Sequence, residues 1–131
     1  MIKGFGHIAF IVSDMKESLK FYCDVLGFTH VFDIKDDKGN PWIEYIKVRD
    51  GQFIELFYGA PNRDKNQSYS HLCLEVDDIY DIAKVIKSHG YELLVEPQQG
   101  KDLNYQCWAT DPDGNRIEFM QISEESPQRK C

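Results

Sequence analysis

The sequence predicts an α+β fold in which two copies of one βαβββ unit follow each other along the chain. Two observations carry this prediction. The 131-residue chain repeats its own pattern at an offset of about 64 residues, and each copy combines one helical run with four strand-like runs. Hydrophobic residues make up 42% of the chain, which is enough to bury a core. We therefore expect a single domain over residues 1–131.

The repeat is clearest at the two ends of each copy. Each copy begins with a histidine in a short apolar run, His7 or His71, and ends with the pattern Asp-Gly-x-x-Ile-Glu, at Glu55 or Glu118. The histidine and the glutamate are 48 positions apart in the first copy and 47 in the second. This agreement indicates that the two copies share one fold and one arrangement of polar side chains.

In the first module, the apolar run at 7–12 predicts a strand that leads into a helix. Asp14 is the expected N-cap of this helix, apolar residues follow at helical spacing as far as Leu26, and Gly27 ends it. Turn residues separate the three remaining strand-like runs, at 28–34, 42–48 and 52–58.

The second module repeats this order, with a strand at 71–76 and a helix that begins after Asp78 and ends at Gly90. Its three further strands are expected at 91–95, 104–110 and 115–122. The module boundaries are about 5–59 and 70–122, with a polar junction at 60–69 and a polar tail at 123–131 that we expect to fray.

Strand alternation separates the polar side chains from the helices. In the run 7–12, His7 lies on the face opposite Phe10 and Val12, whose apolar face should contact the helix. The same alternation turns His71, Glu55 and Glu118 away from the helices. If the two modules pair their sheets, two imidazoles and two carboxylates converge. Such a set suits one divalent metal of borderline character, namely Ni, Zn, Co, Mn or Fe.

Charge and composition exclude several classes of function. A net charge of −7, without a cluster of Lys and Arg, argues against nucleic acids and anionic membranes as partners. No apolar run reaches the ~20 residues of a membrane-spanning helix, and the N-terminal residues do not resemble a signal peptide. The four cysteines are widely spaced, which favours reduced thiols. We therefore expect a cytoplasmic protein.

Four segments together resemble the vicinal oxygen chelate (glyoxalase/bleomycin resistance/dioxygenase) superfamily, over residues 5–122. They are His7-Ile8-Ala9-Phe10, Phe53-Ile54-Glu55-Leu56, Ser70-His71-Leu72 and Asp111-Pro112-Asp113-Gly114-Asn115-Arg116-Ile117-Glu118. The resemblance implies paired βαβββ modules that form a cup-shaped mixed sheet around a metal, with the helices on the outer face. Within the superfamily, the full His, Glu, His, Glu set is similar to glyoxalase I, the lactoylglutathione lyases.

This resemblance implies a chemistry and a role for each residue. His7, Glu55, His71 and Glu118 would bind the metal, which binds the two oxygens of a hemithioacetal, such as a methylglyoxal–thiol adduct, and stabilises a cis-enediolate. Glu118 would move the proton between adjacent carbons, with Glu55 as its counterpart. Removing a proton next to a carbonyl independently requires a base and a Lewis acid. The expected partners are a small-molecule substrate and a second copy of the chain, and the site could form within one chain or between two swapped chains.

The sequence departs from glyoxalase I where that family binds glutathione, because Ile11 and Gly59 stand at the positions of an arginine and an asparagine. A different thiol adduct therefore remains open. So do methylmalonyl-CoA epimerase-like enzymes, and dioxygenases or fosfomycin-resistance enzymes that use two histidines and one glutamate. A metal-free binding module of the bleomycin-resistance type is the last alternative, with aromatic walls from Trp42, Phe53, Phe57 and Trp108.

Three further residues carry weaker expectations. Glu44 shares a strand face with Trp42 and Ile46; we expect it to be solvated, with an extra base in the site as the alternative. His30 has no acidic or histidine neighbour at ligand spacing and is expected to be structural. Cys73, two residues after His71, is expected to be a small buried side chain.

Overall fold

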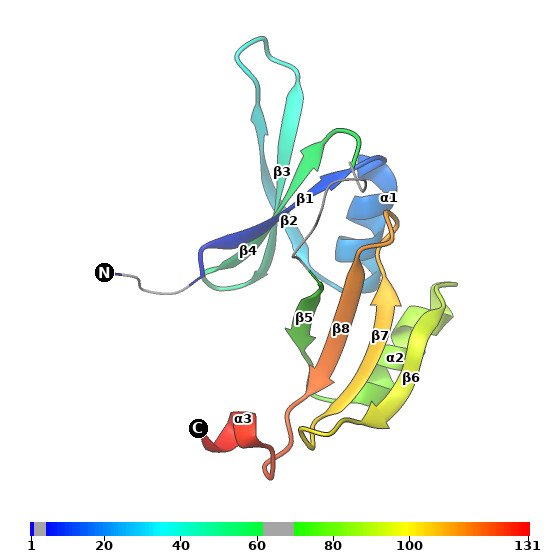
Figure 1. Ribbon diagram of the computed structural model, residues 1–131. Helices are drawn as coiled ribbons and strands as arrows, with labels where there is room; N and C mark the ends of the chain where they lie inside the picture. Colours follow the sequence, from blue (N-terminus) through cyan, green and yellow to red (C-terminus); the bar gives the residue numbers. More distant parts are fainter. Residues whose placement is uncertain (2–4, 62–69) are drawn as a thin grey trace. The chain divides into compact units, whose positions relative to one another are not determined.

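The computed structural model describes residues 1, 5–61 and 70–131 (Figure 1). The chain divides into two compact units, residues 1–66 and 67–131, and each unit contains one four-stranded mixed sheet. The architecture is the predicted pair of tandem βαβββ modules. Most of the expected junction, residues 62–69, lies outside the described residues. No helix within the described part of the chain is long and apolar enough to cross a membrane.

Unit 1 has the strand order β1-β4-β3-β2, in which β1 runs parallel to β4 and the other pairs are antiparallel. Its elements are β1 (His7–Val12), α1 (Met15–Leu19), the π-helical segment η1 (Lys20–Val25), β2 (Thr29–Lys35), β3 (Pro41–Arg49) and β4 (Gln52–Tyr58).

The helix of unit 1 begins as predicted, because the Asp14 side chain accepts a hydrogen bond from the Glu17 N–H at 3.1 Å. It does not stay α-helical, since the N–H of Leu26 donates to the carbonyl of Phe21, five residues earlier, at 3.1 Å. Phe21 and Tyr22 are adjacent, and both are fully buried. The wider π turn accommodates two neighbouring bulky rings against one core, which helical spacing alone does not predict.

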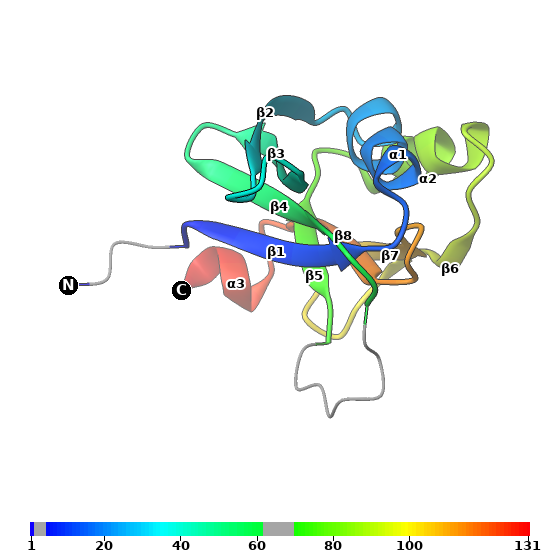
Figure 2. The same cartoon turned by 90° about the horizontal axis from the view of Figure 1, so that it is seen from above.

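Unit 2 has the corresponding strand order β5-β8-β7-β6, again with one parallel pair, β5 and β8. Its elements are β5 (Leu72–Glu75), α2 (Ile79–Ser88), β6 (Leu93–Gln99), β7 (Tyr105–Thr110), β8 (Arg116–Gln121) and α3 (Pro127–Lys130). The α2 helix lies along one face of this sheet (Figures 1 and 2). Asp78 caps α2 by accepting from the N–H groups of Tyr80 and Asp81, as predicted.

Strand register gives each sheet two distinct faces. In unit 1, Phe10 lies beside Leu56 and stacks on Tyr22 of η1, so this is the helix face. Ala9 lies beside Glu55 on the opposite face, which also carries His7 and which we call the histidine face. In unit 2 the buried residues Cys107, Ile117 and Phe119 occupy the helix face. The histidine face of unit 2 carries His71, Cys73, Trp108, Arg116 and Glu118.

A tight turn between β7 and β8 holds the register of the second histidine face. The carboxylate of Asp111 accepts from the N–H groups of Asp113 and Asn115 at 3.0 and 2.8 Å, and Gly114 supplies a positive φ of 77°. The turn between β2 and β3 repeats this pattern, with Asp36 accepting from Lys38 and Asn40. In unit 2 the result is that Trp108 stands directly across from Glu118.

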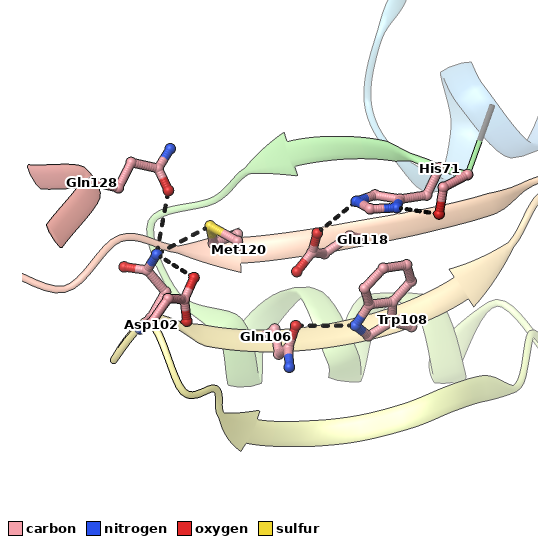
Figure 3. Close-up of polar contacts among 9 residues, drawn as sticks. His71, Asp102, Gln106, Trp108, Glu118, Met120 and Gln128 are labelled. Carbon is pink, nitrogen blue, oxygen red and sulfur yellow. Dashed lines mark hydrogen bonds and ion pairs between the residues drawn. The ribbon is translucent and has the colours of Figure 1, made fainter. Parts of the chain in front are cut away.

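The tail beyond Ser123 is anchored where fraying was expected. The buried side chain of Asn104 accepts from the N–H of Ser123 at 3.0 Å and donates to Gln128 at 3.3 Å; Gln128 is labelled in Figure 3. Ser126 is fully buried and caps the short helix α3. Because Asn104 lies just before β7, this anchor could not be inferred from the polar composition of the tail.

Candidate metal centre

Unit 1 places His7 and Glu55 together at the histidine face. His7 begins β1 and Glu55 is central in the parallel neighbour β4, so their side chains meet with Nε2 3.4 Å from Oε2. Glu55 is only 6% exposed, and the hydroxyl of Tyr45, directly across on β3, donates to its carboxylate. This hydrogen bond is the main cause, and desolvation a smaller one, of the raised pKa of Tyr45, so the phenol stays protonated and donates.

Unit 2 places His71 and Glu118 together in the same way (Figure 3). The Nε2 atom of His71 lies 3.0 Å from Oε2 of Glu118, which is also 6% exposed. The other ring nitrogen, Nδ1, lies 3.0 Å from the hydroxyl of Ser70, which can orient the imidazole. The Trp108 ring contacts the His71 ring edge-on, with centroids 4.7 Å apart.

The structure therefore joins the four expected ligands as two pairs, one in each unit. Within the described residues, no group of three or more His, Cys, Asp or Glu side chains is arranged so that it could hold a metal ion. Convergence of all four on one ion stays a prediction. Each pair offers one imidazole nitrogen and one carboxylate oxygen, and this donor chemistry fits a divalent metal of borderline character.

Tyr45 is a residue of this site that sequence reasoning missed. It occupies the position in unit 1 that Trp108 occupies in unit 2, since each stands across the sheet from its glutamate. An offset of 63 residues relates the two positions, as it relates Glu55 to Glu118. Applying the repeat to the middle strand would have found Tyr45.

The structure corrects the expectation for Glu44. This residue is 8% exposed and lies on the helix face beside Leu56, so it is neither solvated nor available to the histidine face. Its carboxylate accepts from the Tyr58 hydroxyl at 2.8 Å and lies 2.6 Å from Nε2 of His30. His30 is thus a structural partner, as expected, but its acidic neighbour comes from the adjacent strand. Desolvation and the hydrogen bond that its hydroxyl donates to Glu44 raise the pKa of Tyr58.

Cys73 also differs from expectation, because it is exposed rather than buried. Partial desolvation and the Glu118 carboxylate, to which the thiol donates, raise the pKa of Cys73 to about 12. At neutral pH the residue is therefore a thiol and not a thiolate, and it serves Glu118 as a weak hydrogen-bond donor.

The two positions that depart from the glutathione pattern contact each other. Gly59 follows β4, and a Cβ atom added there would lie 2.9 Å from the Cγ2 atom of Ile11. Ile11, on the histidine face of β1, is half exposed. A side chain at position 59 is therefore obstructed while isoleucine occupies position 11, and this part of unit 1 presents an apolar surface.

Comparison with known proteins agrees with this fold. The family model for the glyoxalase/bleomycin resistance protein/dioxygenase superfamily matches residues 4–119. A probable lactoylglutathione lyase of Synechocystis is 31% identical over 123 residues, which cover 89% of this chain and 94% of that protein. A lactoylglutathione lyase of Haemophilus influenzae is 30% identical, with 88% and 90% covered.

Solved structures share the architecture. A crystal structure of a superfamily member from Sphaerobacter thermophilus superposes with a TM-score of 0.77 at 25% sequence identity, covering 92% of this chain and 98% of that one. The family model alone spans well over half of the sequence. The chain belongs to the glyoxalase/bleomycin resistance protein/dioxygenase superfamily.

Proposed function

We propose that the protein is a divalent-metal-dependent lyase of the glyoxalase I type, which isomerises a hemithioacetal such as a methylglyoxal–thiol adduct. One observation carries the proposal: each unit pairs a histidine with a buried glutamate at the same place on its sheet. The lactoylglutathione lyase names of two relatives at about 30% identity support the same reaction class.

His7, Glu55, His71 and Glu118 would hold one ion of Ni, Zn, Co, Mn or Fe. When bound, such an ion supplies a Lewis acid for the substrate oxygens on which negative charge develops. The side chains of the protein supply the rest. Buried carboxylates meet few competing waters, and a positioned carboxylate can take a proton from carbon next to a carbonyl.

Glu118 is the proposed proton carrier. Its carboxylate contacts the His71 imidazole and the Cys73 thiol, whereas the carboxylate of Glu55 accepts from a phenol. It would remove the proton from one substrate carbon and return it to the neighbouring carbon, leaving the enzyme unchanged. Glu55, its counterpart, is held by the Tyr45 hydroxyl. The geometry thus favours Glu118 as the carboxylate that changes its protonation state.

The test has two steps. Elemental analysis of the purified protein should find about one divalent ion per proposed site, and the best-loaded metal should support turnover of methylglyoxal mixed with a thiol. Protein that binds no divalent ion would contradict the metal centre. Loaded protein that turns over no hemithioacetal would reject the lyase while leaving the family assignment intact.

Glu55→Gln separates this lyase from enzymes that use two histidines and one glutamate. His7, His71 and Glu118 alone would suffice for a dioxygenase or a fosfomycin-type enzyme, so the variant would keep the full activity of such a protein. A lyase that uses both carboxylates should instead lose activity strongly. Chelation of the metal should abolish turnover, and adding the ion back should restore it.

We further propose that the protein acts as a homodimer, which sedimentation velocity measures directly. Mixing two inactive variants, His7→Ala and His71→Ala, tests where the ligands of one site come from. If modules of different chains share a site, mixed dimers regain one intact site and activity returns. If each site lies within one chain, every site carries one substitution and the mixture stays inactive.

A further inference from the structure

Arg116 lies on the histidine face of unit 2, next to the proposed catalytic pair. Its guanidinium carbon is 4.7 Å from the centre of the Trp108 ring, within the range of a cation–π contact. The same indole contacts the His71 ring with centroids 4.7 Å apart. One aromatic side chain therefore contacts both the guanidinium and the His71–Glu118 pair, and Figure 3 shows Trp108 beside that pair.

Backbone register holds this arrangement in place. Arg116 and Glu118 are two residues apart on β8 and thus share a face, with about 7 Å between their Cα atoms. Trp108 stands across from Glu118 on β7. Its Nε1–H donates to the side-chain oxygen of Gln106 at 3.2 Å (Figure 3). This hydrogen bond helps to orient the indole that the guanidinium contacts.

The guanidinium is available to a ligand. Arg116 is exposed, and among the described residues it forms no ion pair. Stacking on an indole restrains the side chain while leaving its N–H groups free to donate, and a planar guanidinium matches a carboxylate in a bidentate pair. A cation positioned in this way needs little further ordering when an anion binds.

The position in unit 1 that corresponds to Arg116, 63 residues earlier, is Phe53, whose side chain has no hydrogen-bond donor. Ile11 and Gly59, elsewhere in unit 1, present a further apolar surface. Selectivity for an anionic substrate therefore has its clearest origin in unit 2, beside Glu118 on β8.

We propose that Arg116, held over Trp108, binds a carboxylate on the thiol part of the substrate, so that adducts of short thiol acids are preferred over neutral adducts. The inference rests on the proposed function, because it assigns the substrate class of that same site. Arg116 is a specificity residue in this scheme, and the proton transfer remains with Glu118.

Two thiols of matched size test the proposal. Mercaptoacetate and 2-mercaptoethanol differ chiefly in charge, and each forms a hemithioacetal with methylglyoxal. The ratio of kcat/KM for the acidic to the neutral adduct should fall about 10-fold or more in Arg116→Gln, as expected for loss of a charged hydrogen-bonded pair. The ratio in Arg116→Lys should lie between those of the unmodified protein and Arg116→Gln, because lysine keeps the charge but lacks the planar guanidinium.

Arg49→Gln is the matched control, since Arg49 is an exposed arginine at the end of β3 in unit 1. It should leave the ratio unchanged. A ratio in Arg116→Gln equal to that of the unmodified protein would overturn the inference even though turnover itself would support the lyase.

A binding measurement keeps the inference testable if no adduct is turned over. In a Trp42→Phe background, Trp108 is the single tryptophan and its fluorescence reports on the Arg116 contact. Titration with (methylthio)acetate should give a saturable change that 2-(methylthio)ethanol does not, and that Arg116→Gln weakens about 10-fold or more. Equal responses to both probes, or equal affinity in the variant, would reject the carboxylate site. Failure of turnover alone would count only against the lyase.

Discussion

The residue across the sheet from Glu55 in unit 1 is Tyr45, whereas the residue across from Glu118 in unit 2 is Trp108. Tyr45 donates its hydroxyl to the carboxylate, but the N–H of Trp108 turns away to Gln106. The same scaffold therefore gives Glu55 a cross-strand hydroxyl donor that the residue across from Glu118 does not supply. One difference between β3 and β7 thus gives the two repeated carboxylates different surroundings.

The helix faces of the two sheets differ at the neighbouring position. Unit 1 buries Glu44 between His30 and Tyr58, and the repeat offset of 63 residues places Leu93, Cys107 and Gln121 at the equivalent positions in unit 2. Cys107 is fully buried, and desolvation raises its pKa to about 11. A buried carboxylate is tolerated where a histidine and a phenol accompany it, and unit 2 offers neither.

The largest expected effect separates the two glutamates. Glu118→Gln should lower kcat by about 10²- to 10⁴-fold, because the amide cannot accept the substrate proton. Glu55→Gln should also impair turnover, but at least about ten times less. Steady-state kinetics measure both, with elemental analysis to confirm that each variant still carries metal. Equal losses in the two variants would contradict the assignment of the proton carrier to Glu118.

The next effect concerns the helix faces. Cys107→Glu places in unit 2 the carboxylate that unit 1 already buries, without its partners, and should destabilise the protein by about 3–5 kcal/mol. Urea unfolding followed by circular dichroism measures this loss. Cys107→Ala is the control for removing the thiol and should cost about 1 kcal/mol. If Cys107→Glu lowered the free energy of unfolding no more than Cys107→Ala, a carboxylate could be buried at this position without partners such as His30 and Tyr58.

Two tyrosines then provide a matched pair, since each donates to a glutamate from opposite faces of the unit 1 sheet. Tyr45→Phe should lower kcat/KM about 3- to 10-fold, because Glu55 loses a donor worth about 1 kcal/mol. Tyr58→Phe should leave turnover unchanged and should lower the free energy of unfolding by about 1 kcal/mol. An equal change of kcat/KM in the two variants would contradict a specific role for the Tyr45 hydroxyl in the site.

The smallest effect is expected for Glu44→Gln, at about 0.5 kcal/mol of stability. The amide keeps an acceptor for the Tyr58 hydroxyl but loses the charged contact with His30. Equilibrium unfolding detects a loss of this size, and unchanged kcat provides the internal control. An unaltered free energy of unfolding would show that the His30–Glu44 contact contributes nothing to stability.

Several features were predictable because they depend on short stretches of chain. The two-residue period of the strands put His7 and Glu55 on the face away from the helix, and aspartate side chains marked both helix starts. The same period placed Glu44 on one face with Ile46. It did not show which face of the sheet α1 and η1 cover. The π-helical segment was not predicted, because it depends on the burial of the adjacent residues Phe21 and Tyr22 in the folded unit.

By itself, the sequence determined the repeated βαβββ order, the identity of the paired histidines and glutamates, and the family, because alternation, capping and turn chemistry are local. Tertiary structure decided which side chains meet between strands. The hydroxyl of Tyr45 meets Glu55, the guanidinium of Arg116 meets Trp108, and Asn104 meets the tail, each through register or packing between distant segments. Such contacts depend on cross-strand geometry, which no single stretch of chain encodes.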